Sequence, residues 1–254
     1  MTEDLVLECV DLRKTYSNGK LAVDGVTLEI PRGQTHGLVG ESGSGKSTVA
    51  RMALLLEKPT SGRVRLLGED ITDLSQKRLR PKRGTMQLVL QDPIAALNRS
   101  RPVRHAIELP LILHTAMTRQ QRDARIAELL DLVGLDRALA DRHPSELSGG
   151  QCQRIGIARA LALNPELVVL DEAVSAIDVV MQAQILNLLK DLQRSLGLTY
   201  LFVSHDLAVV KYMSHSMTVM RAGIVEEQGD CEEIFRSTTN AYTRELIAAV
   251  PTFG

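Results

Sequence analysis

The eight residues from Gly40 to Ser47 read GESGSGKS and match the pattern G-x-x-x-x-G-K-[ST] in full. Glycines at these positions allow backbone N–H groups to turn inward, whereas side chains would keep phosphate groups out. Lys46 is expected to reach the β- and γ-phosphates of a nucleotide, and the Ser47 hydroxyl to ligate Mg²⁺. A chance glycine–serine turn is the alternative. Because the motif lies between a predicted strand, QTHGLVG, and a predicted helix, KSTVARMALLLE, we interpret it as a phosphate-binding loop, the P-loop.

A second segment that could do chemistry is LVVLDE, at residues 167–172. Its apolar residues predict a buried strand, and Asp171 follows at the carboxyl end, where parallel sheets bind ligands. Asp171 would hold Mg²⁺ through its water shell, and Glu172 could accept a proton from an attacking water. A strand that ends in an acidic helix cap is the alternative. Together with a complete P-loop, the segment indicates nucleotide hydrolysis.

Two polar residues follow other apolar runs of the chain. His205 comes directly after TYLFVS, and Gln91 comes after MQLVL. At the ligand-binding edge of the same sheet, His205 could donate a hydrogen bond to a γ-phosphate, and Gln91 could contact Mg²⁺ or the attacking water. A lone histidine is more often structural than catalytic. We therefore expect catalytic roles for both residues only in combination with the P-loop.

The segment LSGGQ, at residues 147–151, reads as a second anion-binding helix start. Ser148 can cap the helix, and Gln151 lies three residues on, which is the pattern of a capping box. A well-made helix start is therefore one explanation. The two glycines, however, leave N–H groups uncovered, which capping alone does not require, and such a helix end can bind an anion. Because no second P-loop occurs in the sequence, we expect this anion to belong to another chain's nucleotide.

The charge, the apolar runs and the cysteines of the chain restrict the classes of function that fit it. The net charge is -1, so no overall basic field points to nucleic acid, and the basic run QKRLRPKR at residues 76–83 is interpreted as a solvated turn. The start MTEDLVLECV lacks the pattern of a signal peptide, and no apolar run approaches the roughly 18 residues of a membrane span. The three distant cysteines predict reduced thiols. We expect a cytoplasmic protein with any membrane role supplied by a partner.

The elements that must position these residues alternate between strands and helices. Residues 1–90 and 165–254 contain the strand signals, whereas residues 91–164 are interpreted as a helical insertion. In that insertion a helix is predicted between a cap at Thr118 and a stop at Gly134. Its apolar residues share one face: Ile126, Leu129, Leu130 and Val133. The pattern predicts an α/β fold with a mostly parallel sheet covered on both faces.

Six motifs occur together in the order and with the spacing of an ATP-binding-cassette (ABC) ATPase: the P-loop, LQDP, LSGGQ, VVLDE, SAID and FVSH. The chain resembles this family over nearly its whole length. The resemblance implies one ABC ATPase domain over residues 1–254, with a RecA-like P-loop NTPase core, an N-terminal antiparallel β subdomain and an inserted α-helical subdomain. It also implies ATP hydrolysis with Mg²⁺, coupled to transmembrane transport.

The same resemblance assigns roles to individual residues. Tyr16 matches the aromatic residue that stacks on adenine, and the implied ATP-binding set is Tyr16, Gly40, Glu41, Ser42, Gly43, Ser44, Gly45, Lys46, Ser47 and Thr48. The implied catalytic residues are Gln91, Glu172 and His205, and the implied Mg²⁺ ligands are Ser47, Gln91 and Asp171. Family members pair head to tail. One subunit then acts on its partner's nucleotide through Ser148, Gly149, Gly150, Gln151 and Asp178.

Finer features are similar to the cytosolic ATPase subunits of bacterial oligopeptide, dipeptide and nickel importers: QDPIAALN, DEAVSAIDVVMQAQILNLL, SHDLAVV and AYTRELIAAVP. The implied partners are a second ATPase subunit, identical or paralogous, integral membrane permease subunits and, indirectly, an extracytoplasmic solute-binding protein, with no nucleic acid. The implied location is peripheral on the inner face of the cell membrane. Permease contact is expected between Gln91 and Asn98, with Ile94 and Leu97 as candidates and plain core packing as the alternative.

Some positions depart from the family pattern, among them Cys152 after LSGGQ, Ile177 in SAID and Leu90 before Gln91. None removes a catalytic group, but they leave the cargo open. A non-transport ABC ATPase of DNA repair or translation and an exporter subunit are the alternatives within the family. A GTPase or small-molecule kinase would leave LSGGQ unexplained. Salt-dependent nucleic-acid affinity would support the first alternative, whereas copurification with an integral membrane protein would support transport.

Overall fold

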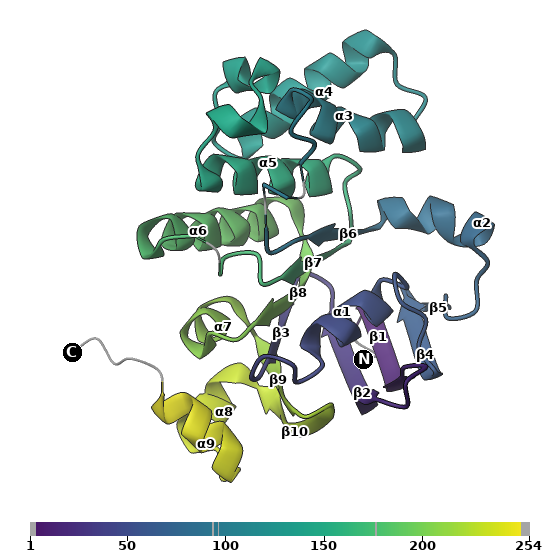
Figure 1. Cartoon of the computed structure of the whole chain (residues 1–254), viewed down its shortest axis with the longest axis vertical. Helices are drawn as coiled ribbons and strands as arrows, with labels where there is room; N and C mark the ends of the chain where they lie inside the picture. The colour runs from purple at the N-terminus through teal and green to yellow at the C-terminus, as the bar shows by residue number, and fades with distance from the viewer. Residues whose placement is uncertain (1–3, 93, 96, 176, 250–254) are drawn as a thin grey trace. The chain divides into compact units, whose positions relative to one another are not determined.

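The alternating strand and helix signals are realised in two compact units, whose elements are labelled in Figure 1. The computed structural model describes residues 4–92, 94–95, 97–175 and 177–249. One unit consists of Met1–Gln76 together with Leu198–Gly254, and the other of Lys77–Gly197. The segment 91–164, predicted to be helical, lies in the second unit, which also contains β7 (Leu167–Asp171) and α6 (Val179–Leu196).

The first unit contains an antiparallel sheet built from the N-terminal strands. Its order is β2 (Leu21–Pro31), β1 (Leu5–Thr15), β4 (Ser61–Leu66) and β5 (Glu69–Asp70). Cys9 of β1 lies in register with Leu28 of β2 and Val64 of β4, and all three side chains are fully buried. Burial raises the pKa of the Cys9 thiol, so this cysteine is a protonated core residue. The implied N-terminal antiparallel β subdomain is thus present.

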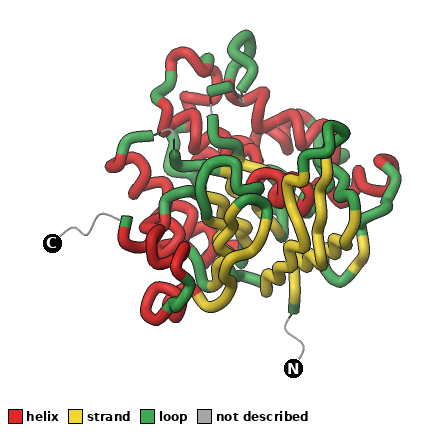
Figure 2. The backbone as a smooth tube through the Cα atoms, turned by 60° about the horizontal axis from the view of Figure 1, so that its bottom comes forward, coloured by secondary structure: helices red, strands yellow, loops and turns green. Residues whose placement is uncertain are grey.

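A second, mainly parallel set of strands in this unit carries the P-loop. Strand β3 (Thr35–Val39) pairs in parallel with β8 (Thr199–Ser204) and with β9 (Ser216–Arg221), and β9 pairs antiparallel with β10 (Ile224–Asp230). Every residue of β3 and β8 is buried, as is typical of parallel strands covered on both faces. Helices α1 (Lys46–Ala53) and α7 (Leu207–Met213) contact β8, and α8 (Cys231–Ser237) and α9 (Ala241–Ala248) contact β10. Figure 2 shows these strands in yellow and the helices in red.

The second unit joins two parallel strands to a group of helices. Strand β6 (Met86–Val89) pairs in parallel with β7. Helices α3 (Val103–His114), α4 (Arg119–Leu132) and α5 (Gly149–Leu161) pack on one another, and α5 also contacts β6 and α6. Short helical turns complete the unit: α2 (Gln76–Leu79), η1 (Arg80–Gly84), η2 (Arg137–Asp141) and η3 (Pro144–Glu146). None of the described helices has both the length and the hydropathy to cross a membrane.

Helix α4 begins and ends where the sequence predicts. Thr118 Oγ1 accepts a hydrogen bond from the Gln121 N–H at 3.3 Å, and Gln121 Oε1 accepts one from the Thr118 N–H at 2.7 Å, which forms a capping box. Gly134 follows the helix with a positive φ of 67°. The predicted apolar face is buried: Ile126, Leu129, Leu130 and Val133.

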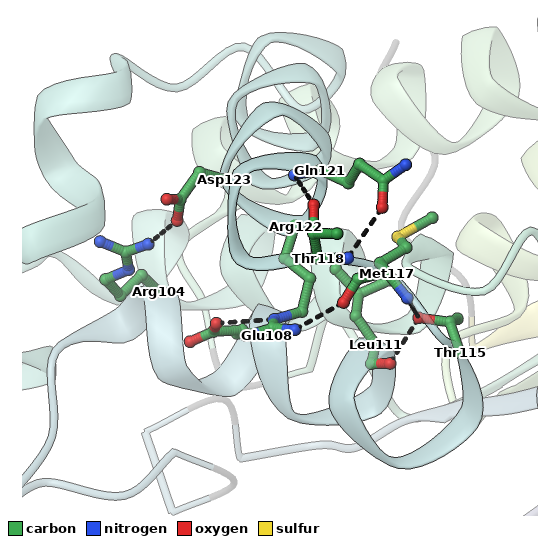
Figure 3. A network of polar contacts seen from close by, with 9 residues as sticks. All are labelled: Arg104, Glu108, Leu111, Thr115, Met117, Thr118, Gln121, Arg122 and Asp123. Carbon is green, nitrogen blue, oxygen red and sulfur yellow. Dashed lines mark hydrogen bonds and ion pairs between the residues drawn. The ribbon is translucent and has the colours of Figure 1, made fainter.

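A polar network fixes the connection between α3 and α4 (Figure 3). Arg122 of α4 donates from Nε to Glu108 Oε1 at 3.0 Å and from Nη1 to the carbonyl oxygen of Met117 at 2.7 Å. One arginine therefore holds both α3 and the linking segment. Arg104 of α3 also forms an ion pair with Asp123 of α4. These contacts add directional bonds to the apolar packing of the two helices.

A buried histidine lies in β3, the strand that leads into the P-loop. His36 is 1% exposed, with Nδ1 2.8 Å from Ser216 Oγ and Nε2 2.9 Å from Thr218 Oγ1. Burial lowers the pKa of His36 to about 4, so the ring is neutral at pH 7. In the neutral ring one nitrogen donates and the other accepts, and both find a hydroxyl partner.

Acid is therefore expected to destabilise the protein through His36. The unfolded chain takes up this proton near pH 6.5 and the folded chain only near pH 4, so the free energy of unfolding falls as the pH falls between these values. From about pH 7.5 to about pH 5 this group alone is expected to remove about 2 kcal/mol. Urea unfolding of the wild type and of His36→Gln at both pH values measures the difference. An identical pH dependence in the two proteins would contradict the assignment.

Candidate functional site

Two glycines of the P-loop are fixed by close packing against neighbouring strands. At Gly40, which has a φ of 148°, a Cβ atom would lie 2.1 Å from the carbonyl oxygen of Met220. At Gly45, which has a φ of 102°, a Cβ atom would lie 2.6 Å from the carbonyl oxygen of Ala22. These neighbours are backbone atoms, so no side chain fits at either position. The glycine spacing is thus a packing requirement of this fold.

The side chain of Lys46 lies inside the loop. It is 4% exposed, and Nζ donates to the carbonyl oxygens of Gly40 at 2.7 Å and Glu41 at 2.8 Å. A buried ammonium group needs such partners, because the loss of hydration disfavours its charge. Ser47 and Thr48 follow in the first turn of α1, whose N-terminal end carries partial positive charge. The loop therefore combines an ammonium group, a helix start and hydroxyls, which together suit a phosphate.

The remaining loop residues differ in exposure. Ser42 and Gly43 are exposed, whereas Ser44 is buried. The carbonyl oxygen of Ser44 accepts a hydrogen bond from the N–H of Gly223 at 3.0 Å, in the turn between β9 and β10. The tip of the loop is thus accessible to solvent, while its base is held by the sheet.

Tyr16 follows β1 and lies beside the first turn of α1. Its Oη is 3.5 Å from Thr48 Oγ1 and donates to Glu57 Oε2 at 3.2 Å. Lys14 Nζ lies 5.4 Å from the centre of the ring, within the distance of a cation–π contact. The residue is 37% exposed. An accessible aromatic ring next to the P-loop helix is placed where a nucleobase could stack.

His205 lies at the same sheet edge as the P-loop. Strands β3 and β8 are parallel neighbours, with Val39 in register with Ser204. The next residues, Gly40 and His205, therefore leave the sheet at adjacent carboxyl ends. His205 is exposed, and the following Asp206 caps helix α7.

In the second unit, three predicted site residues share one sheet edge. Asp171 ends β7 and is 8% exposed. Strand β6 runs parallel to β7 with Val89 in register with Leu170, so Gln91 and Glu172 follow at adjacent carboxyl ends. Gln91 is exposed and Glu172 is half-buried. The arrangement places a carboxamide and two carboxylates at one edge.

The backbone of Glu172 is strained. Its φ of 51° lies in the left-handed region, which is uncommon for residues other than glycine. The carbonyl oxygen of Glu172 accepts two hydrogen bonds from Ser175, from its N–H at 3.1 Å and from its Oγ at 2.9 Å. Such strain persists where surrounding contacts impose it, and it concentrates at functional sites.

The LSGGQ segment starts helix α5 with the predicted capping box. Ser148 Oγ accepts from the Gln151 N–H at 3.2 Å, and Gln151 Oε1 accepts from the Ser148 N–H at 2.9 Å. Ser148 is exposed and Gly149 is half-buried. Gly150 is buried beneath Met181 of α6, since a Cβ atom at Gly150 would lie 2.1 Å from Met181 Cε. A flexible side chain of the same unit therefore covers the second glycine.

The start of α6 lies next to this helix tip through Met181. Asp178 caps α6, and its Oδ1 accepts from the Met181 N–H at 2.9 Å. The next two residues are apolar yet strongly exposed: Val179 is 77% and Val180 is 69% exposed. Ala176 of the SAID motif, like Pro93 and Ala96 near Gln91, lies outside the described residues.

The structure thus assembles the predicted residues in two sets. The first unit brings together Tyr16, the P-loop and His205. The second unit brings Gln91, Asp171 and Glu172 to one sheet edge, and it joins the LSGGQ tip to the start of α6. The sequence gives no signal for Met181 or Ser175, because their contacts depend on how separate segments fold onto one another.

The chain is similar in sequence to known proteins. The family model described as ABC transporter matches residues 23–175. The oligopeptide transport ATP-binding protein OppD of Mycobacterium tuberculosis is 53% identical over 230 residues, which are 91% of this chain and 37% of that protein. A putative peptide import ATP-binding protein of Brucella abortus is 51% identical over 254 residues and covers 98% of this chain and 76% of that protein. The chain thus spans little more than a third of the length of its mycobacterial relative.

Solved structures show the same cassette fold. CbiO1 from Clostridium perfringens, part of the ABC transporter complex cbiONQ, has a TM-score of 0.84 at 30% identity and covers 92% of this chain and 91% of that chain. The cassette MJ0796, in a dimeric post-hydrolysis state bound to ADP and Pi, has a TM-score of 0.80 at 33% identity and covers 89% of this chain and 98% of that chain.

The resemblance inferred from the six motifs is therefore confirmed. Both relatives carry names of peptide transport, and neither carries a name of nickel transport. The chain belongs to the ABC transporter family, and its relatives described here are oligopeptide and peptide import ATP-binding proteins.

Proposed function

We propose that this chain is the ATP-hydrolysing subunit of a bacterial peptide importer. The observation that carries the proposal is the P-loop, in which Gly40 and Gly45 pack against backbone carbonyls and Lys46 lies within the loop. The names of the relatives supply the cargo class, oligopeptides or dipeptides. A transported nickel complex is the less supported cargo.

In this proposal the first unit binds ATP. The Tyr16 ring stacks on adenine, which its exposure and its place beside Thr48 permit. The P-loop backbone and the α1 start receive the phosphates. Lys46 turns from its carbonyl partners toward the β- and γ-phosphates, which compensate its charge more strongly than neutral carbonyls. His205 donates a hydrogen bond to the γ-phosphate from the adjacent strand end.

The second unit supplies the residues for hydrolysis. Glu172 accepts a proton from the attacking water, and Gln91 positions that water. Ser47, Gln91 and Asp171 would each offer Mg²⁺ a side-chain oxygen atom, the kind of ligand this ion takes alongside waters and substrate phosphates. When bound, Mg²⁺ would neutralise the charge that develops on the phosphates.

A second cassette is expected to complete the site. Ser148 and the glycine N–H groups at the α5 tip would bind the γ-phosphate of the partner's ATP, with Gln151 keeping the tip capped and Asp178 acting from the start of α6. Exposed Val179 and Val180 support this, because adjacent apolar side chains at 77% and 69% exposure favour burial by a partner. For a phosphate to reach Gly150, the Met181 side chain must move aside. The partner can be a copy of this chain or a paralogue.

The membrane partner is expected to contact the helical part of the second unit. Leu97 is 5% exposed, so its own side chain belongs to the core, whereas Ile94 is half-buried. Leu97 lines a cavity of about 170 Å³ together with Arg101, His105 and Leu109. This cavity could receive a cytosolic segment of a permease. Such binding would place the subunit at the inner face of the membrane. An extracytoplasmic solute-binding protein would deliver the cargo to the permease and would not contact this subunit.

Glu172→Gln is expected to reduce ATP turnover by roughly 10²–10⁴-fold, because the amide cannot act as a general base. ATP affinity should be retained, since no phosphate contact is removed. Steady-state phosphate release and ATP titration measure the two quantities. Glu128→Gln, at an exposed glutamate of the same unit, is the matched control and should leave both unchanged. Undiminished turnover in Glu172→Gln would remove this residue from the proposed mechanism.

Tyr16→Ala is expected to weaken ATP binding by about 5-fold or more, because loss of base stacking commonly removes 1–3 kcal/mol. Tyr16→Phe keeps the ring and should bind ATP nearly as the wild type does. Fluorescence titration with an ATP analogue distinguishes the variants. If Phe weakens binding as much as Ala, the hydroxyl contacts to Thr48 and Glu57 matter and stacking does not.

A further inference from the structure

The C-terminal helix α9 reaches the P-loop through one side chain. Tyr242, in the first turn of α9, is 5% exposed, and its Oη accepts a hydrogen bond from the backbone N–H of Glu41 at 3.5 Å. The two residues are 201 positions apart in the sequence. Both belong to the first unit, so the contact lies within one compact unit.

The ring of Tyr242 is itself held by Arg221. The guanidinium carbon of Arg221 lies 4.7 Å from the centre of the ring, which is the geometry of a cation–π contact. Arg221 is the last residue of β9, and the turn that follows β9 makes a second contact with the P-loop. There the Gly223 N–H donates to Ser44 at 3.0 Å, and the Gly223 carbonyl accepts from the Asp24 N–H at 2.8 Å.

The C-terminal segment thus holds the P-loop at two places, Glu41 and Ser44. We name Tyr242, Arg221 and Gly223 the C-terminal brace. Glu41 is held on both sides, because its N–H bonds to Tyr242 while its carbonyl accepts from Lys46 Nζ at 2.8 Å. The Glu41 carbonyl also accepts from the Ser44 N–H at 3.2 Å. When Lys46 turns toward a phosphate, its contact is lost, and Glu41 is then held by Ser44 at its carbonyl and by Tyr242 at its N–H.

We propose that Tyr242 is a positioning residue for nucleotide binding, whose hydroxyl keeps the first turn of the P-loop in its phosphate-binding shape. The proposal rests on the proposed ATP-binding function of the loop. Tyr242 itself need not touch the nucleotide. Its effect passes through the Glu41 backbone, and Arg221 fixes the ring orientation. Preorganising a loop in this way improves affinity by reducing the ordering that binding otherwise requires.

The test uses Tyr242→Phe, which removes the hydroxyl and keeps the ring packed. Tyr212→Phe is the matched control, because Tyr212 is 46% exposed and lies in α7 of the same unit. Two readouts are taken on the full chain: hydrogen exchange of the Glu41 amide without nucleotide, and ATP affinity in the presence of Mg²⁺. Loss of one hydrogen bond predicts about 2- to 10-fold faster exchange and about 2- to 10-fold weaker binding for Tyr242→Phe alone.

A purely structural role would lower the melting temperature of Tyr242→Phe while leaving both readouts equal to those of Tyr212→Phe, and that result overturns the proposal. Arg221→Gln, which leaves Tyr242 intact, should shift both readouts in the same direction and serves if Tyr242→Phe does not fold. If the wild type binds no ATP, the proposed function of the loop fails. The exchange of the Glu41 amide then still decides whether the brace exists.

Discussion

Close packing of the P-loop backbone against two neighbouring strands is the constraint on which this structure depends. The backbone of the loop lies so close to the carbonyl oxygens of Met220 and Ala22 that only glycine fits at positions 40 and 45. This contact joins the loop to β2 and β9, strands that are far apart in the sequence. The loop backbone is thereby fixed by the strands, while the Lys46 side chain, bonded to the carbonyl oxygens of Gly40 and Glu41, is the part that must turn to contact a phosphate.

The same constraint connects the loop to the C-terminal part of the chain. The turn after β9 bonds to Ser44 through Gly223, and α9 adds Tyr242 at Glu41. The P-loop is therefore held by segments that lie far from it in the sequence, up to 201 positions further along the chain. Removal of α9 would therefore remove the hydrogen bond between Tyr242 and Glu41 of the P-loop. None of the residues of the six motifs lies in α9.

Local sequence patterns predict much of the secondary structure and of the P-loop. The strand–loop–helix context of the P-loop, the cap at Thr118, the capping box at Ser148 and the buried face of α4 follow from spacing alone. The cover of Met181 over Gly150, the left-handed backbone of Glu172 and the contact of Tyr242 with Glu41 do not. Each depends on packing between separate segments. For Leu97 the sequence left permease contact and core packing open, and the buried side chain agrees with core packing.

The proposal that most needs a direct test is that two cassettes share each ATP. The capped, exposed Ser148 tip and the exposed valines at the start of α6 fit a surface that a partner covers. A structure of the protein with a non-hydrolysable ATP analogue and Mg²⁺ tests this most directly, through the distances from the γ-phosphate to Lys46 and Ser148. We expect the γ-phosphate at hydrogen-bond distance from Lys46 of one cassette and from Ser148 of the other. A triphosphate enclosed by a single chain, with Ser148 left in solvent, would contradict it.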